Sequence, residues 1–134
     1  MSQWTHVCGC IRYDALRMAG MPYATLDQIK ELIGHPVNYD DAKEKWDACN
    51  VPCGSEGSIQ FVFWSNRSLN SLAAFTVGIF GDLRDFGSED VPKIKEWFEK
   101  VTKSEGVMVR SAILEIEVEY SDEPIILRHE KRLD

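Results

Sequence analysis

The sequence predicts a single α+β domain over residues 1–134, with an antiparallel sheet that carries its helices mainly on one face. Three observations support this fold class. Short segments rich in β-branched and aromatic residues alternate in polarity. Helical periodicity is confined to separate stretches between them, and glycine, proline or asparagine marks most of the boundaries.

The first half of the chain is expected to contain one strand and two short helices. Residues 4–13, WTHVCGCIRY, alternate weakly in polarity and are typical of an opening strand. A capping box at residues 25–28, TLDQ, and a stop signal at Gly34 predict a helix over about 25–34. Residues 40–49, DDAKEKWDAC, begin with acids and predict a second short helix.

Two strands are expected in the middle of the chain, joined as a hairpin by a polar turn. Strand 58–64 places one set of side chains on one face and Gln60, Val62 and Trp64 on the other. Strand 72–83, LAAFTVGIFGDL, is apolar on both faces, which is typical of a central strand.

The last part of the chain predicts one helix and two strands. Ser88 is expected to cap a helix over 89–103, in which apolar residues recur every three or four positions. In the second half of strand 107–120, Leu114, Ile116, Val118 and Tyr120 are expected to point inward, and IILRHE (125–130) forms the last strand. The complete order matches a ferredoxin-like split β-α-β arrangement with a C-terminal β-hairpin added.

Composition and charge limit the class of protein. A formal net charge of −7 argues against binding to long nucleic acid, which needs a basic face. The sequence contains neither an apolar run of the ~18–20 residues that span a bilayer nor a secretion signal, so a cytoplasmic protein is expected. The four cysteines are then expected to be buried thiols, because C-x-C followed by C-x3-C is not a standard zinc knuckle. Neither a metal nor a cofactor is predicted.

The loop PCGSEGS (52–58) is open to several interpretations. The simplest is a turn whose glycines supply positive φ before a strand. Its backbone N–H groups can alternatively form an anion-binding nest, although the loop leads into a strand rather than a helix and has no P-loop lysine. Cys53 has the position of an exposed nucleophile, but no pattern connects it to a histidine base.

The segment GDLRDFG (81–87) is the second candidate for a site. It leaves the predicted central strand with two carboxylates and one guanidinium, which suit a metal or an anion, or simply pair with each other in a turn. Antiparallel pairing of strands 58–64 and 72–83 predicts that this turn lies beside the loop. Arg12 and Arg110 add possible anion partners, and Trp64 adds a stacking surface. The predicted ligand-binding residues are Arg12, Cys53, Gly54, Ser55, Gly57, Ser58, Trp64, Asp82, Arg84, Asp85 and Arg110.

Three stretches, WTHVCGCIR (4–12), PCGSEGSIQF (52–61) and GIFGDLRDF (78–86), resemble small accessory proteins of phages and prophages from Gram-positive bacteria. The resemblance implies a small, acidic, homo-oligomeric viral protein in the host cytoplasm. Several groups of such proteins sequester a host immune nucleotide signal or block a host defence protein. No residue role follows from it.

The expected function is therefore a non-enzymatic, anti-defence binding protein. Its target is either a small anionic, nucleotide-like signal or a host defence protein, with no membrane contact. A homo-oligomer, a dimer or larger, is expected because the C-terminal hairpin leaves a strand at the sheet edge. Two alternatives stay open: a small metal-dependent phosphodiesterase or nuclease that uses Asp82 and Asp85, and a virion or assembly component. No residue is assigned as catalytic.

Overall fold

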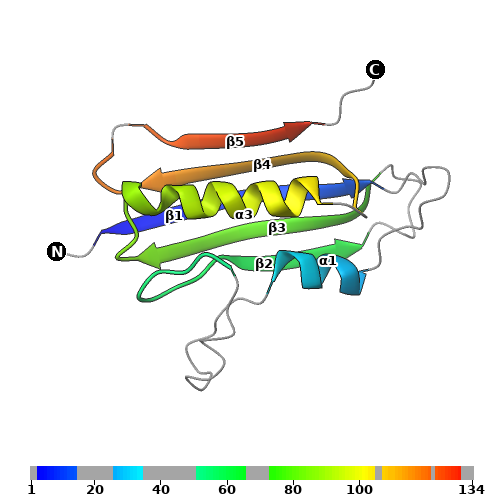
Figure 1. The fold of residues 1–134 in the computed structure, drawn as a ribbon, viewed down its shortest axis with the longest axis horizontal. Helices are drawn as coiled ribbons and strands as arrows, with labels where there is room; N and C mark the ends of the chain where they lie inside the picture. Colours follow the sequence, from blue (N-terminus) through cyan, green and yellow to red (C-terminus); the bar gives the residue numbers. More distant parts are fainter. Residues whose placement is uncertain are drawn as a thin grey trace.

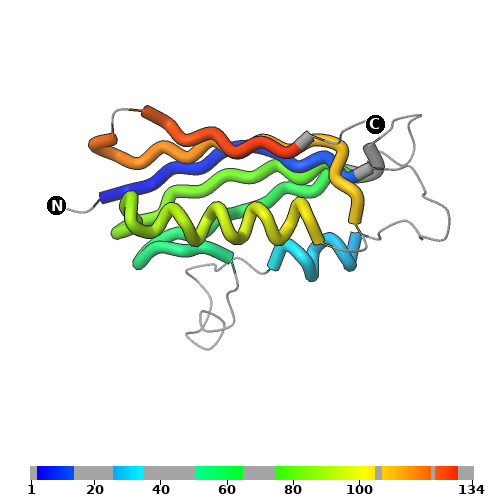
Figure 2. Tube along the Cα trace, turned by 45° about the horizontal axis from the view of Figure 1, so that its top comes forward, coloured from blue at the N-terminus to red at the C-terminus, as the bar shows by residue number. Residues whose placement is uncertain are grey.

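The computed structural model describes residues 3–14, 26–34, 51–65, 73–104, 107–121 and 123–130. Within them, one antiparallel sheet has the strand order β2-β3-β1-β4-β5. The strands are β1 (Trp4–Asp14), β2 (Gln60–Ser65), β3 (Ala73–Arg84), β4 (Val109–Val118) and β5 (Ile125–Glu130). Helices α1 (Leu26–Ile33) and α3 (Val91–Lys103) lie on the same face of the sheet, as Figures 1 and 2 show. The predicted α+β class is confirmed.

Most predicted elements occur close to their expected positions. Helix α1 ends at Ile33, and the N–H of Gly34 donates to the carbonyl of Lys30 at 3.0 Å, as the stop signal predicts. The threonine of the capping box and the helix predicted over 40–49 lie outside the described residues. Neither described helix is long and apolar enough to cross a membrane.

The start of α3 differs from the prediction that Ser88 caps the helix. Ser88 instead begins a 3₁₀ turn, η1 (Ser88–Asp90), and Asp90 is the residue before α3. The Asp90 N–H donates to the Gly87 carbonyl at 2.9 Å, and the Gly87 N–H donates to the Asp90 carboxylate at 3.2 Å. A hydrogen bond from Lys93, followed by the one from Gly87, holds the pKa of Asp90 below its usual value. Asp90, two residues later, therefore takes the N-cap position predicted for Ser88, and its carboxylate accepts from Gly87 and Lys93 rather than from the N–H groups of α3.

The prediction that Tyr120 points inward is wrong. Strand β4 ends at Val118, and the Ser121 N–H donates to the Val118 carbonyl at 3.0 Å, which closes a turn. Tyr120 adopts φ 67° inside this turn and is 75% exposed. The alternation of β4 is therefore lost two residues earlier than the sequence pattern suggests.

The core fills the space between the sheet and the two helices. Alternate residues of the strands point to this side, as predicted for β2, and pack against the apolar side chains of α1 and α3. Two core aromatics also satisfy helix carbonyls near the C-terminal ends, which lack intrahelical partners. The Trp97 indole donates to Ile33 at 2.9 Å, and the Tyr13 hydroxyl donates to Val101 at 3.0 Å. Burial raises the pKa of the Tyr13 hydroxyl.

The opposite face of the sheet is covered by none of the described helices, and we call it the open face (Figure 2). It carries several exposed large hydrophobic side chains. Cys8 lies on it and is exposed, so the expectation of buried thiols is wrong for this cysteine. Cys10 and Cys53 are half-buried free thiols, and Cys49 lies outside the described residues.

Candidate functional site

The loop at residues 53–58 and the turn at 82–85 lie side by side, as antiparallel pairing of β2 and β3 predicted. The Ser55 N–H donates to the Arg84 carbonyl at 2.8 Å, and the Arg84 N–H donates to the Glu56 carbonyl at 2.9 Å. We call this pair of segments the loop–turn clasp. Gly57 adopts φ 81°, which glycine accommodates without strain. The prediction that a glycine of this loop supplies positive φ is therefore correct for Gly57.

Side-chain contacts reinforce the clasp, and they engage groups that were predicted to bind an anion. The Arg84 guanidinium contacts the Glu56 carboxylate at 2.6 Å. The Ser55 hydroxyl donates to the Asp85 carboxylate at 2.5 Å. Cys53 and Ser58 form an isolated β-bridge across the base of the loop, and Ser58 is buried. These contacts favour a structural role for the loop over an anion nest.

The two carboxylates of the turn have different partners. Asp85 contacts the loop, whereas Asp82 lies on the open face with its carboxylate 2.6 Å from Nδ1 of His6. The Nε2 atom of His6 lies 3.3 Å from Glu119. The hydrogen bond to Asp82 raises the pKa of His6, burial lowers it, and Glu119 raises it further. Among the described residues, no three histidine, cysteine or acidic side chains form a group that suits a metal ion.

The remaining predicted ligand residues do not join the clasp. Trp64 pairs with Thr76 near the opposite end of β3 and is 59% exposed. Arg12 pairs with the same Thr76 from β1, so it shares the open face with Trp64 at that end. Arg110 lies near the start of β4 and is half-buried. The predicted set is therefore divided between two ends of the sheet.

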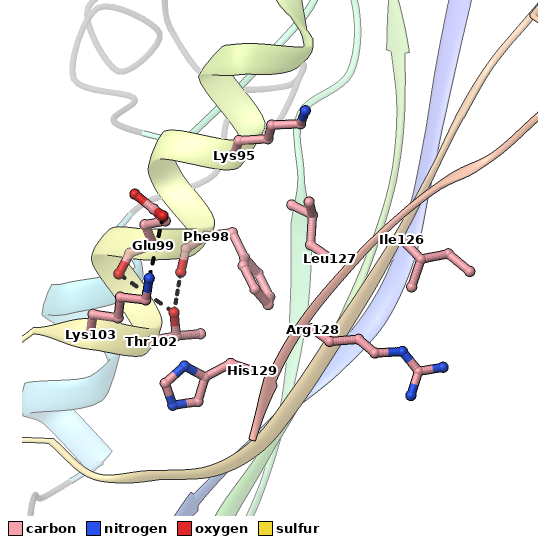
Figure 3. Close-up of a pocket in the computed structure, with 9 residues that line it drawn as sticks. All are labelled: Lys95, Phe98, Glu99, Thr102, Lys103, Ile126, Leu127, Arg128 and His129. Atoms are coloured by element: carbon pink, nitrogen blue, oxygen red, sulfur yellow. Dashed lines mark hydrogen bonds and ion pairs between the residues drawn. The ribbon is translucent and has the colours of Figure 1, made fainter. Parts of the chain in front are cut away.

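A groove between α3 and β5 carries cationic side chains on the helix-covered face. Its volume is about 260 Å³. Figure 3 shows Phe98 and Leu127 facing each other at its centre, with Lys95 at one end and Lys103 beside His129 at the other. The groove exists because β5 is the edge strand beyond β4 and α3 leaves part of it uncovered (Figure 1).

The groove combines an apolar floor with cations, a combination found in small-ligand sites. Lys103 shares its charge with Glu99, 3.4 Å away on the same helix. Within the described part of the chain, neither the Lys95 ammonium group nor the His129 imidazole has a hydrogen-bond or ion-pair partner. The Arg128 side chain points away from the groove toward the open face, so Arg128 lines the groove only with its backbone (Figure 3). The groove therefore offers the nitrogen groups of Lys95 and His129 to an anionic group of a ligand, and an apolar surface to the rest of that ligand.

Sequence reasoning missed the groove, although a signal for it exists. Lys95, Glu99 and Lys103 recur every four residues and therefore lie along one flank of the helix. The alternation of β5 places Leu127 and His129 on the core side together. What the pattern does not supply is the position of α3 over the sheet, which decides that this flank meets β5.

Comparison of the chain with protein-family models, curated proteins and solved structures finds no match.

Proposed function

We propose that this chain is a viral accessory protein of the host cytoplasm that counters host defence by binding a small anionic, nucleotide-like ligand without turning it over. The observation that carries the proposal is the groove between α3 and β5. Its lysines and imidazole suit a phosphate or carboxylate, and the Phe98–Leu127 floor suits a ring. The viral setting rests on the resemblance in the three sequence stretches.

The groove fits a small ligand better than a large one. Its volume of about 260 Å³ lies just below the range of ~300–1,000 Å³ that drug-sized ligands occupy. Lys95 at one end and His129 near the other allow an anion at either end, with the apolar floor between them (Figure 3). The net charge of −7 does not oppose this, because the field at the groove depends on nearby groups more than on the whole chain.

The strand order β2-β3-β1-β4-β5 supports a finer description of the fold. With β1 between β3 and β4, and α1 and α3 on one face, the first four strands suit a ferredoxin-like split β-α-β unit. Strand β5 then extends that unit at its edge and supplies one wall of the groove. We include this relationship in the proposal.

The experiment begins with ligand that the protein retains. The chain is purified from infected cells, and a native mass spectrum records any bound small molecule. The protein is then denatured and the released molecule is analysed. An intact nucleotide-like compound supports binding without turnover. A cleaved product supports the phosphodiesterase alternative, and copies of the chain in purified particles support the virion alternative.

Variants then connect the ligand to the groove. Lys95→Ala combined with His129→Ala removes the two nitrogen groups that the groove offers to an anion, while Lys100→Ala on the same helix as Lys95 is the matched control, because Lys100 is exposed outside the groove. Hydrogen bonds to charged groups contribute about 1.5–3 kcal/mol, so the double variant is expected to bind at least tenfold more weakly. Retention of the ligand by the double variant, or no ligand with the wild-type protein and no thermal shift with a panel of mono- and cyclic nucleotides, would contradict the proposal.

A further inference from the structure

The open face is the largest feature that the proposed ligand groove does not use. Four large hydrophobic side chains on it are 48–59% exposed. They come from β2, β3 and β5, and they are Val62, Trp64, Phe80 and Ile126. Between them in the strand register lie exposed Cys8, half-buried Cys10 and Ile113, and one charged residue, half-buried Glu115. Contiguous apolar surface of this kind marks interaction sites rather than ordinary solvent-facing sheet.

The strand register places an acidic cluster and Arg12 at opposite ends of this face. Asp82, His6 and Glu117 occupy neighbouring positions on β3, β1 and β4 at one end. Cys8 and Phe80 form the next row, and Cys10 and Gly78 the one after it. Arg12 lies in the row beyond, on β1. The two middle rows are mainly apolar but carry one charge each, Glu115 beside Cys8 and Arg128 beside Ile113.

This layout is complementary to a copy of itself. A two-fold axis that lies between two facing sheets and crosses their strands reverses the order of the rows. Arg12 of each copy then faces His6 of the other, between the carboxylates of Asp82 and Glu117 in the same row. Glu115 lies diagonally opposite Arg128 of the other copy. An axis parallel to the strands would instead bring acid against acid.

The same axis also matches the shapes of the apolar rows. It sets Phe80 of one copy opposite Gly78 of the other, because these residues lie in adjacent rows of β3. Gly78 leaves room on the open face: a Cβ added there would have no neighbour nearer than 3.8 Å. Phe80, which is 48% exposed, therefore meets a hollow rather than a second aromatic ring.

The face has the size of a small interface. All five strands, ~4.8 Å apart, cover the rows from Cys8 to Arg12, about 24 Å by 14 Å, and three of them continue about 14 Å towards Trp4. The resulting planar area is roughly 540 Å² per copy before side-chain relief is added, about two thirds of the ~800 Å² per partner of standard interfaces.

We propose that two copies of this chain pack through their open faces about a two-fold axis that crosses the strands. The sheets then form the two inner layers of a sandwich, ~10 Å apart, with the helices of each copy outside. The proposal does not depend on the ligand groove, which lies on the helix-covered face and stays accessible in the dimer. Failure of either proposal therefore leaves the other standing.

The first test is the mass of the full chain in solution across a dilution series, by light scattering and sedimentation. The wild-type protein is expected to have twice the mass of one chain at micromolar concentration. Phe80→Lys is expected to be monomeric with an intact circular dichroism spectrum, because Phe80 is already half exposed in one copy. Tyr120→Lys is the matched control, since Tyr120 is 75% exposed but lies off the open face in the β4–β5 turn, and it is expected to stay dimeric.

A charge exchange tests the axis. Arg12→Glu is expected to weaken the dimer at least tenfold, and adding Glu117→Arg to it is expected to restore most of the affinity. A monomeric wild-type protein overturns the proposal, as does a Phe80→Lys variant that dimerises as tightly as Tyr120→Lys. A dimer that the second charge change does not restore overturns the orientation of the axis.

Discussion

Substituting Gly54 by alanine should open the loop–turn clasp. A Cβ at this position would lie 2.1 Å from the carbonyl oxygen of Arg84 and 2.6 Å from its nitrogen. Both are backbone atoms of β3, which is paired with β1 and β2 and has little freedom to shift. The loop at residues 53–58 must therefore move away from the strand.

The cost follows from the contacts that this movement breaks. Two backbone hydrogen bonds join Ser55 and Glu56 to Arg84, and each contributes about 1 kcal/mol. The Glu56–Arg84 ion pair is largely exposed, with side-chain exposures of 52% and 38%, and such pairs add about 0.2–1 kcal/mol. The free energy of unfolding should therefore fall by about 2–3 kcal/mol, which corresponds to roughly 8–12 °C in Tm for a chain of this length.

Urea unfolding followed by tryptophan fluorescence measures this loss, at one fixed protein concentration so that association does not change the result. Gly78→Ala is the matched control, made in the Phe80→Lys background that is expected to be monomeric, because Gly78 faces Phe80 of the other copy in the proposed dimer. The nearest atoms to its added Cβ belong to Val62 at 3.8 and 3.9 Å, so no clash arises and stability should stay unchanged or rise by up to about 1 kcal/mol. A Gly54→Ala variant within about 0.5 kcal/mol of the wild type would show that the clasp does not hold the loop as the geometry indicates.

Two further predictions concern buried and exposed polar contacts. Tyr13→Phe leaves the Val101 carbonyl without the hydroxyl that donates to it at 3.0 Å, so urea unfolding should show a loss of about 1 kcal/mol. His6 has a pKa raised chiefly by Asp82, so its ion pairing stabilises the fold below about pH 6.5 and this contribution disappears as pH rises through the folded-state pKa. His6→Gln should therefore cost up to about 1 kcal/mol at pH 5.5 and close to nothing at pH 8.5, and an equal cost at both pH values would refute the assignment.

The strands were predictable because each has one face in the core. The alternation of β2 and of most of β4 follows directly from the position of the helices on one side. The pattern failed at Tyr120, where an apolar residue continues the alternation but the backbone has already turned with φ 67°. A turn that does not use glycine or proline leaves no local signal at the residue itself.

The clasp was predictable in position and unpredictable in function. Antiparallel pairing alone puts the loop beside the turn, whatever the side chains are. Whether Arg84 is available to a ligand depends on Glu56, whose carboxylate lies 2.6 Å from it, and sequence spacing does not reveal that contact. The same limit applies to Asp82, which pairs with His6 from another strand rather than with Asp85.

The composition of β3 shows what the fold lacks. Its sequence is apolar on both faces, and this predicted an interior strand, which the order β2-β3-β1 bears out. An interior position satisfies the hydrogen bonds along both edges of a strand, but it covers neither face. The helices cover the face that includes Val77 and Leu83, while Phe80 on the other face is 48% exposed.

An antiparallel sheet that faces water on one side usually shows polar residues there. Strand β4 follows this rule with Glu115 and Glu117 on the open face, whereas Val62 on β2 and Phe80 on β3 break it. The apolar side chains thus need a second layer, and domains bury such a face against another element. None of the described helices supplies one, and a second copy would do so in the dimer that we propose. The helices of each copy would then cover one face of its sheet, and the partner copy would cover the other.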